Sequence, residues 1–472
     1  MAEHIDEKEI KKQREYIYKI KELNRRFAAK HGRMPLANTE TYGCQQNEND
    51  TERIRGILKE ADFDFCENAD RADVVIYNTC AVRENAEQKV FGRLGILKHI
   101  KESKPDMIIG ICGCMVQQEH ITEKIKKVHP QVDLVFGTHA LYSFPELLYK
   151  AMTKRKGNII DIHNSDGVIA EDMPILRDYT QKAWVSVMYG CNNFCSYCIV
   201  PYVRGRERSR TKEAILKEVK ELVKNGCSEI SLLGQNVNSY GKDLDEDIDF
   251  AGLLRLVNNI PGVERIRFMT SHPKDLSDSL IDAIAECDKV CKQLHLPVQA
   301  GNNRVLKEMN RKYTKEQYLE KIQKVKERIP NISLSTDIIV GFPTETIEDF
   351  EDTIDVIRKV EYDNIFSFIY SPREGTPAAK MKFVLSDDEI HENFNRLLEV
   401  QNEISKKKND EYVGRIERVL VDGTSKNNEE MLSGRCDSSK IVNFKGDKSL
   451  IGKYVNVKIT EAHTWSLNGE LV

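Results

Sequence analysis

Short runs rich in β-branched and aromatic residues alternate with helical patterns along most of this 472-residue chain. In the first stretch, these runs lie at residues 37–42, 74–78, 107–111 and 132–136. Alternation of this kind is typical of βαβ units, whose strands join one parallel sheet. The pattern therefore predicts a parallel-sheet α/β domain over residues 36–153.

A second alternating stretch covers residues 182–408. Its strand-like runs lie at residues 184–188, 229–233, 265–269, 293–297, 333–339 and 364–370. Six β/α repeats predict a partial (β/α)6 barrel of the TIM type, and such barrels place their chemistry at the C-terminal ends of the strands. Functional residues are therefore expected just after these runs, in an α/β protein of several domains.

The remaining parts of the chain have other patterns. Residues 409–472 contain short alternating runs at 415–421, 439–444 and 454–460, separated by turn residues, which predicts a small β-barrel. Residues 1–35 are highly charged and have no apolar run, so we expect a solvated, partly helical extension and no targeting signal. Residues 154–181 have weak periodicity and are expected to form a linker. No apolar run is long enough for a membrane-spanning helix.

Twelve cysteines occur in a chain for which we predict a cytoplasmic location. In a reducing compartment, grouped cysteines are more often metal ligands or catalytic thiols than disulfides. The net charge of -4, from 71 basic and 75 acidic residues, gives no sign of nucleic-acid binding. Any RNA site must therefore be a local patch.

Three cysteines follow the first strand of the predicted barrel with the spacing CxxxCxxC: Cys191, Cys195 and Cys198, called the loop thiols below. Soft thiolates select zinc or iron–sulfur centres. Structural zinc usually takes four protein ligands, and no fourth Cys or His lies nearby in the sequence. Three thiolates on a four-iron cube leave one iron open. The spacing therefore favours a [4Fe-4S] cluster that binds a substrate over a zinc site.

Three further cysteines each follow a strand of the first domain: Cys44, Cys80 and Cys114, called the sheet thiols below. Their spacing matches successive β/α units, which would bring them to one edge of the parallel sheet. They therefore predict a second three-ligand cluster. Cys112 is a close alternative to Cys114, although as a strand residue it is expected to face the core. A structural role is expected for Cys66, Cys227, Cys287, Cys291 and Cys436, and a packed or hydrogen-bonded role for His272 and His295.

Two such thiol groups followed by a small β-barrel resemble the methylthiotransferase family of radical S-adenosylmethionine (SAM) enzymes. The resemblance covers nearly all of the chain from residue 36 onward and rests on residues 40–45, 78–86, 191–210, 233–241, 270–273, 294–301 and 335–343. It implies an N-terminal methylthiotransferase domain, a radical SAM barrel and an RNA-binding barrel called TRAM. Within the family, these segments look like the tRNA-2-methylthio-N6-dimethylallyladenosine synthases. One departure is Gln46, where Met is expected; it flanks a ligand and is not one itself.

The resemblance implies that a methylthio group is attached to C2 of N6-isopentenyladenosine at position 37 of tRNA. Sister groups act on threonylcarbamoyladenosine in tRNA or on an aspartate of a ribosomal protein. The implied cofactors are two [4Fe-4S] clusters and SAM. The cluster on the sheet thiols would carry the delivered sulfur, which a first SAM methylates. A second SAM, cleaved at the loop-thiol cluster, would give the 5′-deoxyadenosyl radical that activates C2–H.

The resemblance also suggests contacts to SAM. An aromatic residue beside the third loop thiol and polar groups at strand ends are implied: Tyr197, Gln235, Ser271, Gln299 and Asp337. Each of the polar groups has an ordinary strand-end or hydrogen-bonding interpretation as well. Both clusters are expected to face one cavity, with the α/β domain over the mouth of the barrel.

Four arginines alternate directly after the loop thiols: Arg204, Arg206, Arg208 and Arg210. If this segment is extended, they point one way, and arginine forks suit phosphate oxygens and base edges. A salt-bridged surface strand is the alternative. The C-terminal barrel is charge-balanced, so its RNA role rests on the resemblance. The target base of the anticodon loop is expected to be flipped into the cavity.

Two other classes of protein remain open at this point. An electron-transfer protein usually saturates each cluster with four cysteines, which two sets of three do not provide. An RNA-binding scaffold with structural metal would contain zinc and no iron. For the enzyme, the expected partners are tRNA, an electron donor such as flavodoxin or ferredoxin, and a sulfur-supply or iron–sulfur assembly system. A monomer without a membrane partner is expected.

Overall fold

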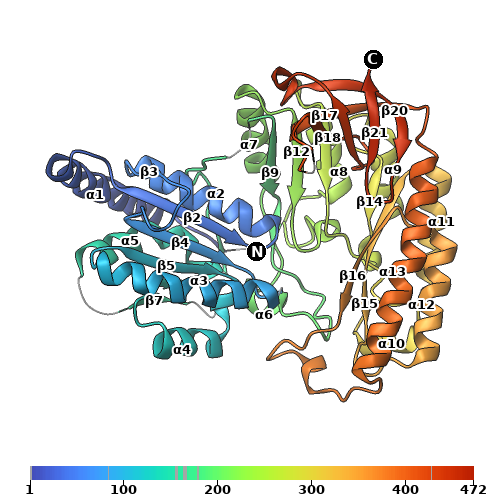
Figure 1. The fold of residues 1–472 in the computed structure, drawn as a ribbon, viewed down its shortest axis with the longest axis horizontal. Helices are drawn as coiled ribbons and strands as arrows, with labels where there is room; N and C mark the ends of the chain where they lie inside the picture. The colour runs from blue at the N-terminus through green and yellow to red at the C-terminus, as the bar shows by residue number, and fades with distance from the viewer. Residues whose placement is uncertain (1–2, 83, 155–157, 163–166, 178–179, 427) are drawn as a thin grey trace.

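The computed structural model describes residues 3–82, 84–154, 158–162, 167–177, 180–426 and 428–472. Three units are visible in Figure 1: an α/β unit in blue and teal, a larger barrel in green to orange, and a small β-barrel in red. The α/β unit lies beside the larger barrel, and the red barrel covers one of its ends. None of the described helices has the length and apolar character needed to cross a membrane.

A six-stranded parallel sheet forms the α/β unit, in the order β3-β2-β4-β5-β6-β7. The predicted parallel sheet is thereby confirmed. Apolar side chains fill both faces of the sheet, one under α1, α2 and α5 and the other under α3 and α4. The strands are β2 (Leu36–Tyr42), β3 (Asp64–Phe65), β4 (Val74–Thr79), β5 (Ile108–Gly113), β6 (Leu134–Phe136) and β7 (Ile159–Asp161). The helices are α1 (Glu7–His31), α2 (Gln45–Glu60), α3 (Glu84–Ser103), α4 (Glu119–Val128) and α5 (Phe144–Thr153).

The N-terminal helix α1 is docked on this unit and is not simply a solvated extension. Ile17 and Ile20 are buried in the core beneath α2 and α5. Asn24 donates a hydrogen bond to the Ala61 carbonyl at 2.8 Å. The sequence pattern did not indicate this apolar stripe, because the stripe is narrow and the rest of the helix is polar and charged.

The region expected as a linker also contributes strands. β7 pairs with β6 as the last strand of the six-stranded sheet, and β8 (Val168–Ile169) pairs with β1 (Glu3–His4). Part of this region therefore packs with the α/β unit, although its sequence periodicity is weak.

The predicted partial (β/α)6 barrel is confirmed by six parallel strands with helices outside them (Figure 1). The strands form two three-stranded sheets, which an isolated parallel bridge between Ile266 and Val290 connects. They are β9 (Lys182–Ser186), β12 (Glu229–Leu233), β13 (Arg265–Phe268), β14 (Gln293–His295), β15 (Ser333–Val340) and β16 (Asn364–Ile369). The helices are α7 (Lys212–Lys224), α8 (Phe250–Asn258), α9 (Asp278–Glu286), α10 (Asn303–Glu308), α11 (Lys315–Arg328), α12 (Ile347–Val360) and α13 (Asp387–Asp410). The loop after β9 holds β10 (Met188–Tyr189), α6 (Val200–Arg204) and β11 (Arg208–Ser209).

The C-terminal unit is a closed five-stranded barrel, as its sequence pattern predicts. Its strands are β17 (Ile416–Thr424), β18 (Met431–Arg435), β19 (Ile441–Lys445), β20 (Tyr454–Ala462) and β21 (Leu467–Leu471). The sequence pattern did not indicate β18 and β21, because each contains a glycine and neither has a long apolar alternation. Pairing with neighbouring strands stabilises both of them.

Two buried arginines join this small barrel to the beginning of β13. Arg265 donates to the Arg435 carbonyl at 2.9 Å, and Arg267 donates to the Cys436 carbonyl at 2.8 Å. Lys182, the first residue of β9, forms an ion pair with Asp422 at 3.0 Å. The small barrel therefore covers the N-terminal ends of the strands, opposite the ends at which the loop thiols lie.

Candidate active site

The sheet thiols lie just after β2, β4 and β5. Cys44 begins α2 as its N-cap, Cys80 follows β4 directly, and Cys114 follows β5. A hydrogen bond with Cys80 lowers the pKa of the Cys44 thiol, and the same bond raises the pKa of Cys80. The charge of Cys114 raises the pKa of Cys80 further. The fold thus brings three thiols from three separate β/α units to one edge of the sheet.

Cys112 and Cys114 differ in their surroundings although one residue separates them. Cys112 packs in the apolar core together with Val74 and Leu134, and burial raises the pKa of its thiol. Cys114 instead contacts residues from the loop of the barrel, including Val203. Residues two apart on a regular strand share a face, but β5 ends at Gly113, whose φ of 99° turns the chain so that Cys114 leaves the core face that Cys112 occupies.

The loop thiols follow β9, and contacts from elsewhere in the barrel hold their loop. The Ser196 N–H donates to the Met309 carbonyl at 3.0 Å, and the Asn193 amide donates to the Cys191 sulfur at 3.5 Å. Burial raises the pKa of Cys191 to about 11. Burial and the neighbouring Cys195 raise the pKa of Cys198 as well.

One arginine joins the two thiol groups. Arg204, six residues after Cys198, is buried and donates from Nε to the Cys114 sulfur at 3.0 Å. Its Nη2 forms an ion pair with Asp50 of α2 at 2.9 Å. Burial raises the pKa of Cys114, and the positive charge of Arg204 opposes that rise. A side chain of the barrel loop therefore contacts a thiol of the sheet.

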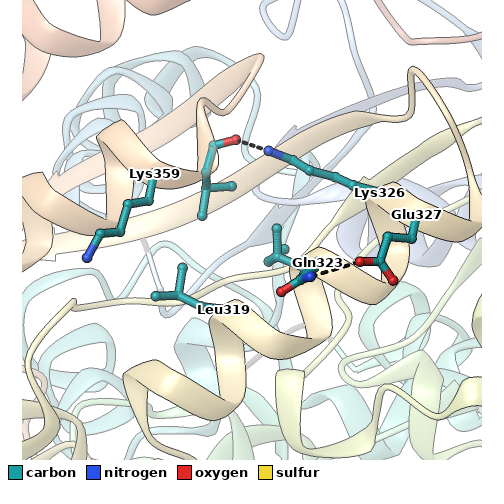
Figure 2. Close-up of a pocket in the computed structure, with 7 residues that line it drawn as sticks. Leu319, Gln323, Lys326, Glu327 and Lys359 are labelled. Carbon is teal, nitrogen blue, oxygen red and sulfur yellow. Dashed lines mark hydrogen bonds between the residues drawn. The ribbon is translucent and has the colours of Figure 1, made fainter.

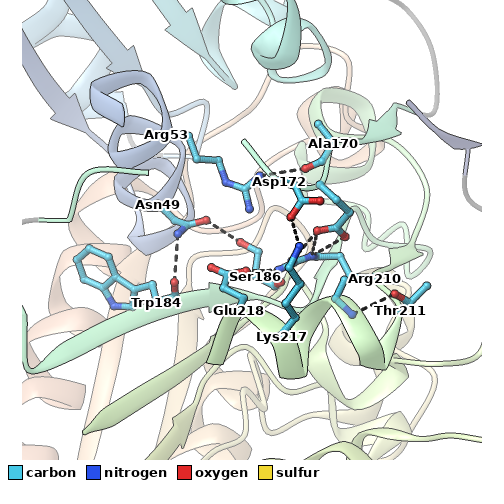
Figure 3. Close-up of polar contacts among 12 residues, drawn as sticks. Asn49, Arg53, Ala170, Asp172, Trp184, Ser186, Arg210, Thr211, Lys217 and Glu218 are labelled. Atoms are coloured by element: carbon cyan, nitrogen blue, oxygen red, sulfur yellow. Dashed lines mark hydrogen bonds and ion pairs between the residues drawn. The ribbon is translucent and has the colours of Figure 1, made fainter. Parts of the chain in front are cut away.

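Polar side chains of α2 form the contact between the α/β unit and β9. Figure 3 shows the Asn49 amide between Trp184 and Ser186; it donates to the Trp184 carbonyl at 3.2 Å and accepts from the Ser186 hydroxyl at 3.0 Å. Gln46 donates to the same hydroxyl at 3.0 Å. The residue that departs from the family pattern is thus an interdomain contact.

The expectation that four arginines point one way from an extended segment is wrong. Arg204 lies in a helix, and Arg204, Arg208 and Arg210 are all buried. Arg210 forms ion pairs with Glu171 at 2.6 Å and with Glu218 at 2.8 Å, part of the network in Figure 3. Only Arg206 of the four is exposed, and its guanidinium lies 4.5 Å from the centre of the Phe194 ring. The four side chains do not share one direction, because α6 and a glycine turn precede the short strand β11.

Of the polar residues suggested for SAM, Gln235, Ser271 and Gln299 follow the C-terminal ends of barrel strands, whereas Asp337 lies inside β15. Gln235 accepts from the Gly190 N–H at 2.5 Å, beside the first loop thiol. The Ser271 hydroxyl is buried and has no hydrogen-bond partner among the described residues. Gln299 has a positive φ of 71° and forms an isolated bridge with Ile338 of β15. The half-buried Tyr197 packs against the barrel core.

His272 and His295 are both engaged in contacts, as expected. His272 accepts from the Lys274 N–H at 3.1 Å, and burial lowers the pKa of its imidazole. His295 lies 3.0 Å from the Ser335 hydroxyl and 3.4 Å from the carboxylate of Asp337, the remaining SAM candidate. This group lines the inner side of β14 and β15.

Two further residues at the thiols, Arg311 and Asp50, were not predicted from the sequence. Arg311 is buried, and it donates to the Cys195 sulfur at 3.5 Å and to the Pro297 carbonyl at 2.7 Å. A single arginine in a loop gives no sequence signal for such a contact. Asp50 had a signal: α2 begins with a long polar run and yet buries most of it. A buried polar helix face indicates polar partners across an interface.

Both thiol groups provide the donor set that iron–sulfur clusters use. Each has three sulfurs, which leaves one iron of a [4Fe-4S] cube free for another ligand. In the described part of the chain, no three His, Cys, Asp or Glu side chains converge on a point suited to a single metal ion. Structural zinc usually takes four protein ligands, whereas each thiol group supplies three, so the donor sets suit a cluster better than tetrahedral zinc.

A cavity of about 370 Å³ lies away from both thiol groups, between α11 and α12 on the outer helical layer (Figure 2). Lys326 and Gln323 line it, but Lys326 donates to the Val360 carbonyl and Gln323 to Glu327, at 2.6 and 2.8 Å. None of the described residues that line this cavity is a cysteine or a histidine. It therefore offers no chemistry to the site.

Three family models match the three units. Residues 37–137 match the Uncharacterized protein family UPF0004, residues 185–357 match the radical SAM superfamily, and residues 410–472 match the TRAM domain. Each matched segment begins close to the first strand of its unit. The barrel fold thus agrees with an independent family description.

Solved structures show the same fold at low sequence identity. The radical S-adenosylmethionine methyltransferase TsrM from Kitasatospora setae, solved with cobalamin and a [4Fe-4S] cluster bound, aligns with a TM-score of 0.53 and 14% identity. The alignment covers 73% of this chain and 77% of that one. The cobalamin-dependent S-adenosylmethionine radical enzyme OxsB, in its apo form, aligns with a TM-score of 0.51 and 12% identity over 80% of this chain and 57% of that one.

Relatives of much higher identity cover nearly the whole chain. The tRNA-2-methylthio-N(6)-dimethylallyladenosine synthase of Acetivibrio thermocellus is 56% identical over 99% of this chain and 98% of its own length. The protein of the same name from Clostridioides difficile is 54% identical over 98% of this chain and 97% of its own length. The chain therefore belongs to the tRNA-2-methylthio-N6-dimethylallyladenosine synthase family of radical SAM methylthiotransferases.

Proposed function

We propose that the sheet thiols bind one [4Fe-4S] cluster and that the loop thiols bind the second, to which SAM is attached. The chain uses SAM and [4Fe-4S] clusters as a member of its family. The separation of Cys112, in the core, from Cys114, at the interface, supports the choice of Cys114 as a ligand. Three thiols per group support one exchangeable iron position in each cluster.

The reaction replaces C2–H of N6-isopentenyladenosine 37 in tRNA with a C2-methylthio group. When bound, the loop-thiol cluster supplies the electron that cleaves SAM, and the sheet-thiol cluster supplies the sulfur. The observation that carries this proposal is the contact from Arg204, next to the loop thiols, to Cys114 of the sheet thiols. It supports a single reaction space for radical formation and sulfur delivery.

The residues of the chain then hold the cofactors and exclude water. Arg204 and Arg311 each hold a cysteine sulfur with a buried, charged N–H donor. SAM is bound by a set of strand-end residues and one aromatic residue: Tyr197, Gln235, Ser271, Gln299 and Asp337. The unpartnered Ser271 hydroxyl supports this assignment, because a buried polar atom without a partner is costly until a ligand satisfies it.

The tRNA contacts both ends of the barrel in this proposal. Residues 409–472 form the TRAM unit, residues 182–408 the radical SAM domain, 154–181 a linker and 36–153 the methylthiotransferase domain. The five residues of β12 span about 17 Å, so an RNA that reaches the TRAM unit and the thiols must extend along the barrel. Exposed Arg206 is the member of the arginine run that remains available to RNA.

Other partners follow from the chemistry of the proposal. Reductive cleavage of SAM needs an electron donor such as flavodoxin or ferredoxin. Repeated turnover needs a sulfur-supply or iron–sulfur assembly system. We place the protein in the cytoplasm, where its tRNA substrate is found. We expect it to be a monomer.

The test combines cluster content with product analysis. After anaerobic reconstitution, about eight irons per chain are expected, falling to about four when Cys191, Cys195 and Cys198 are all replaced by alanine. A matched Cys112→Ala variant should keep all of the iron, whereas Cys114→Ala should lose part of it. Wild-type enzyme with SAM, a reductant and prenylated tRNA should form the methylthio product, identified by mass spectrometry of digested tRNA. One cluster per chain, or zinc in place of iron, would refute the proposal.

A further inference from the structure

Two large aromatic side chains lie exposed on the last strand of the barrel. Phe366 and Phe368 of β16 are 42% and 48% exposed, whereas the side chain of Ile365, on the opposite face of the same strand, is buried. Residues two apart on a strand point to the same face, so the two rings form one apolar surface. Large exposed apolar side chains gathered on one face of a strand indicate a surface that a ligand covers.

The face in question is the inner face of the barrel. Phe366 is paired in register with Asp337, and Phe368 is paired with Ile339, so these four side chains share a face. The opposite face of the same strands, with Ile338 and Ile365, packs into the core under the outer helices. The ring of His295 lies 5.6 Å from the ring of Phe366 and bounds this surface on the side of β14.

The surface reaches the level of the loop thiols. The Ile339 N–H donates to the Gln299 carbonyl at 3.0 Å. Two residues before Gln299, the Pro297 carbonyl accepts from Arg311, whose other nitrogen lies 3.5 Å from the Cys195 sulfur. Phe368 therefore lies near the C-terminal ends of the strands, where SAM is proposed to bind. Phe366 lies two residues further toward the N-terminal end of β16.

The chemistry of this wall selects its occupant. The four side chains are two benzene rings, an aliphatic chain and a carboxylate beside an imidazole. None of the four side chains is a lysine or arginine that could bind a phosphate, whereas a branched five-carbon group can cover the rings. We propose that Phe366 and Phe368 form the site that receives the N6-isopentenyl group of the target adenosine. This inference rests on the proposed function, because only that function brings a prenylated base to the loop thiols.

The proposed site predicts that the enzyme discriminates between RNA with and without the isopentenyl group. A pocket that encloses an alkyl group discriminates against an RNA that lacks it by about ten- to hundredfold. The variant Phe366→Ala/Phe368→Ala removes the wall, whereas Phe366→Leu/Phe368→Leu keeps it apolar. Leu256→Ala is the matched control, since Leu256 is an exposed apolar residue of α8 on the outer layer.

The experiment measures binding of two anticodon stem-loop RNAs, with and without the isopentenyl group on A37, to the reconstituted enzyme. The alanine variant should bind the prenylated RNA at least about tenfold more weakly and the unprenylated RNA as the wild type does. The leucine variant and the control should keep most of the preference. Equal weakening of both RNAs, or an unchanged preference in the alanine variant, would overturn the inference.

Turnover measured in parallel separates this inference from the proposed function. If the wild type binds prenylated RNA preferentially but forms no methylthio product, the proposed function fails. If the wild type forms product and the alanine variant keeps the preference, only the assignment of the wall fails. Iron content, expected to be unchanged in all variants, reports whether the barrel has kept its fold, and the Leu256→Ala control should also keep SAM cleavage without RNA.

Discussion

Replacing Arg204 by methionine should destabilise the protein strongly, because Arg204 is the buried cation between the two larger units. Its side chain is 7% exposed and that of its partner Asp50 is 11% exposed. Methionine keeps much of the aliphatic stem but removes the ion pair at 2.9 Å and the donor to Cys114 at 3.0 Å. Among the described residues, the carboxylate of Asp50 would keep the weaker contact from Gln46 at 3.3 Å and the more distant charge of Arg53.

The expected magnitude follows from the charge that is left behind. Breaking a buried pair by removing one partner costs about 3–5 kcal/mol, mostly because the other charge stays buried and uncompensated. Removing both charges avoids that penalty, so Arg204→Met/Asp50→Asn should recover roughly half or more of the loss. Arg206→Met, two residues along and exposed, should change the free energy of unfolding by less than about 0.5 kcal/mol.

The assay is urea unfolding of the anaerobic, reconstituted protein, followed by tryptophan fluorescence. The chain has two tryptophans, and Trp184 lies at this interface, where its carbonyl accepts from Asn49. A Trp465→Phe background therefore gives a signal from the interface alone. The reasoning is refuted if Arg204→Met unfolds at the wild-type midpoint, or if the double variant is as unstable as the single one.

Three further changes test other parts of the fold. Ile20→Ala, at a side chain of 0% exposure beneath α5, should cost about 2–5 kcal/mol by urea unfolding and loosen α1 to proteolysis. Arg267→Met should remove several contacts to the TRAM unit, worth about 1 kcal/mol each, and should weaken tRNA binding without lowering iron content. Burial raises the pKa of Glu345 to about 7, so the folded state binds this proton more tightly than the unfolded chain does. Stability should therefore fall by about 3 kcal/mol as pH rises from about 4.5 to 7, and Glu345→Gln should flatten that dependence in urea midpoints measured across the range.

Much of the architecture could be predicted because it depends on local patterns. Strand runs followed by helical patterns indicated both parallel units, and the position of each cysteine after a strand predicted which thiols would meet. The choice between Cys112 and Cys114 could be made only weakly, since it depends on where the strand ends, and β5 ends at the glycine between them, whose φ is 99°. The hydrogen bond between the Cys44 and Cys80 thiols follows from the order of strands in the sheet, which the spacing of the β/α units already suggested.

The arginine run shows where local patterns stop being sufficient. Alternation predicts a common direction only for a regular strand, and the turn at Gly205, with a φ of 72°, breaks that regularity. Which arginines are buried was then decided by carboxylates distant in sequence, Asp50 for Arg204 and Glu171 for Arg210. An arginine that is paired inside an interface and an arginine that is available to bind RNA cannot be told apart from the local sequence.

The polar face of α2 gives the physical reason for this arrangement. An apolar contact between the α/β unit and the barrel would have placed no donors near the thiols, and a thiolate cluster carries negative charge that needs them. Hydrogen bonds through Asn49 and Asp50 instead fix the interface by geometry, so the two thiol groups keep one relative position. Because unmatched buried polar groups are costly, such an interface tolerates few alternative registers. The proposed function requires this specificity, since in it sulfur from one cluster is joined to the adenine carbon that the radical formed at the other cluster activates.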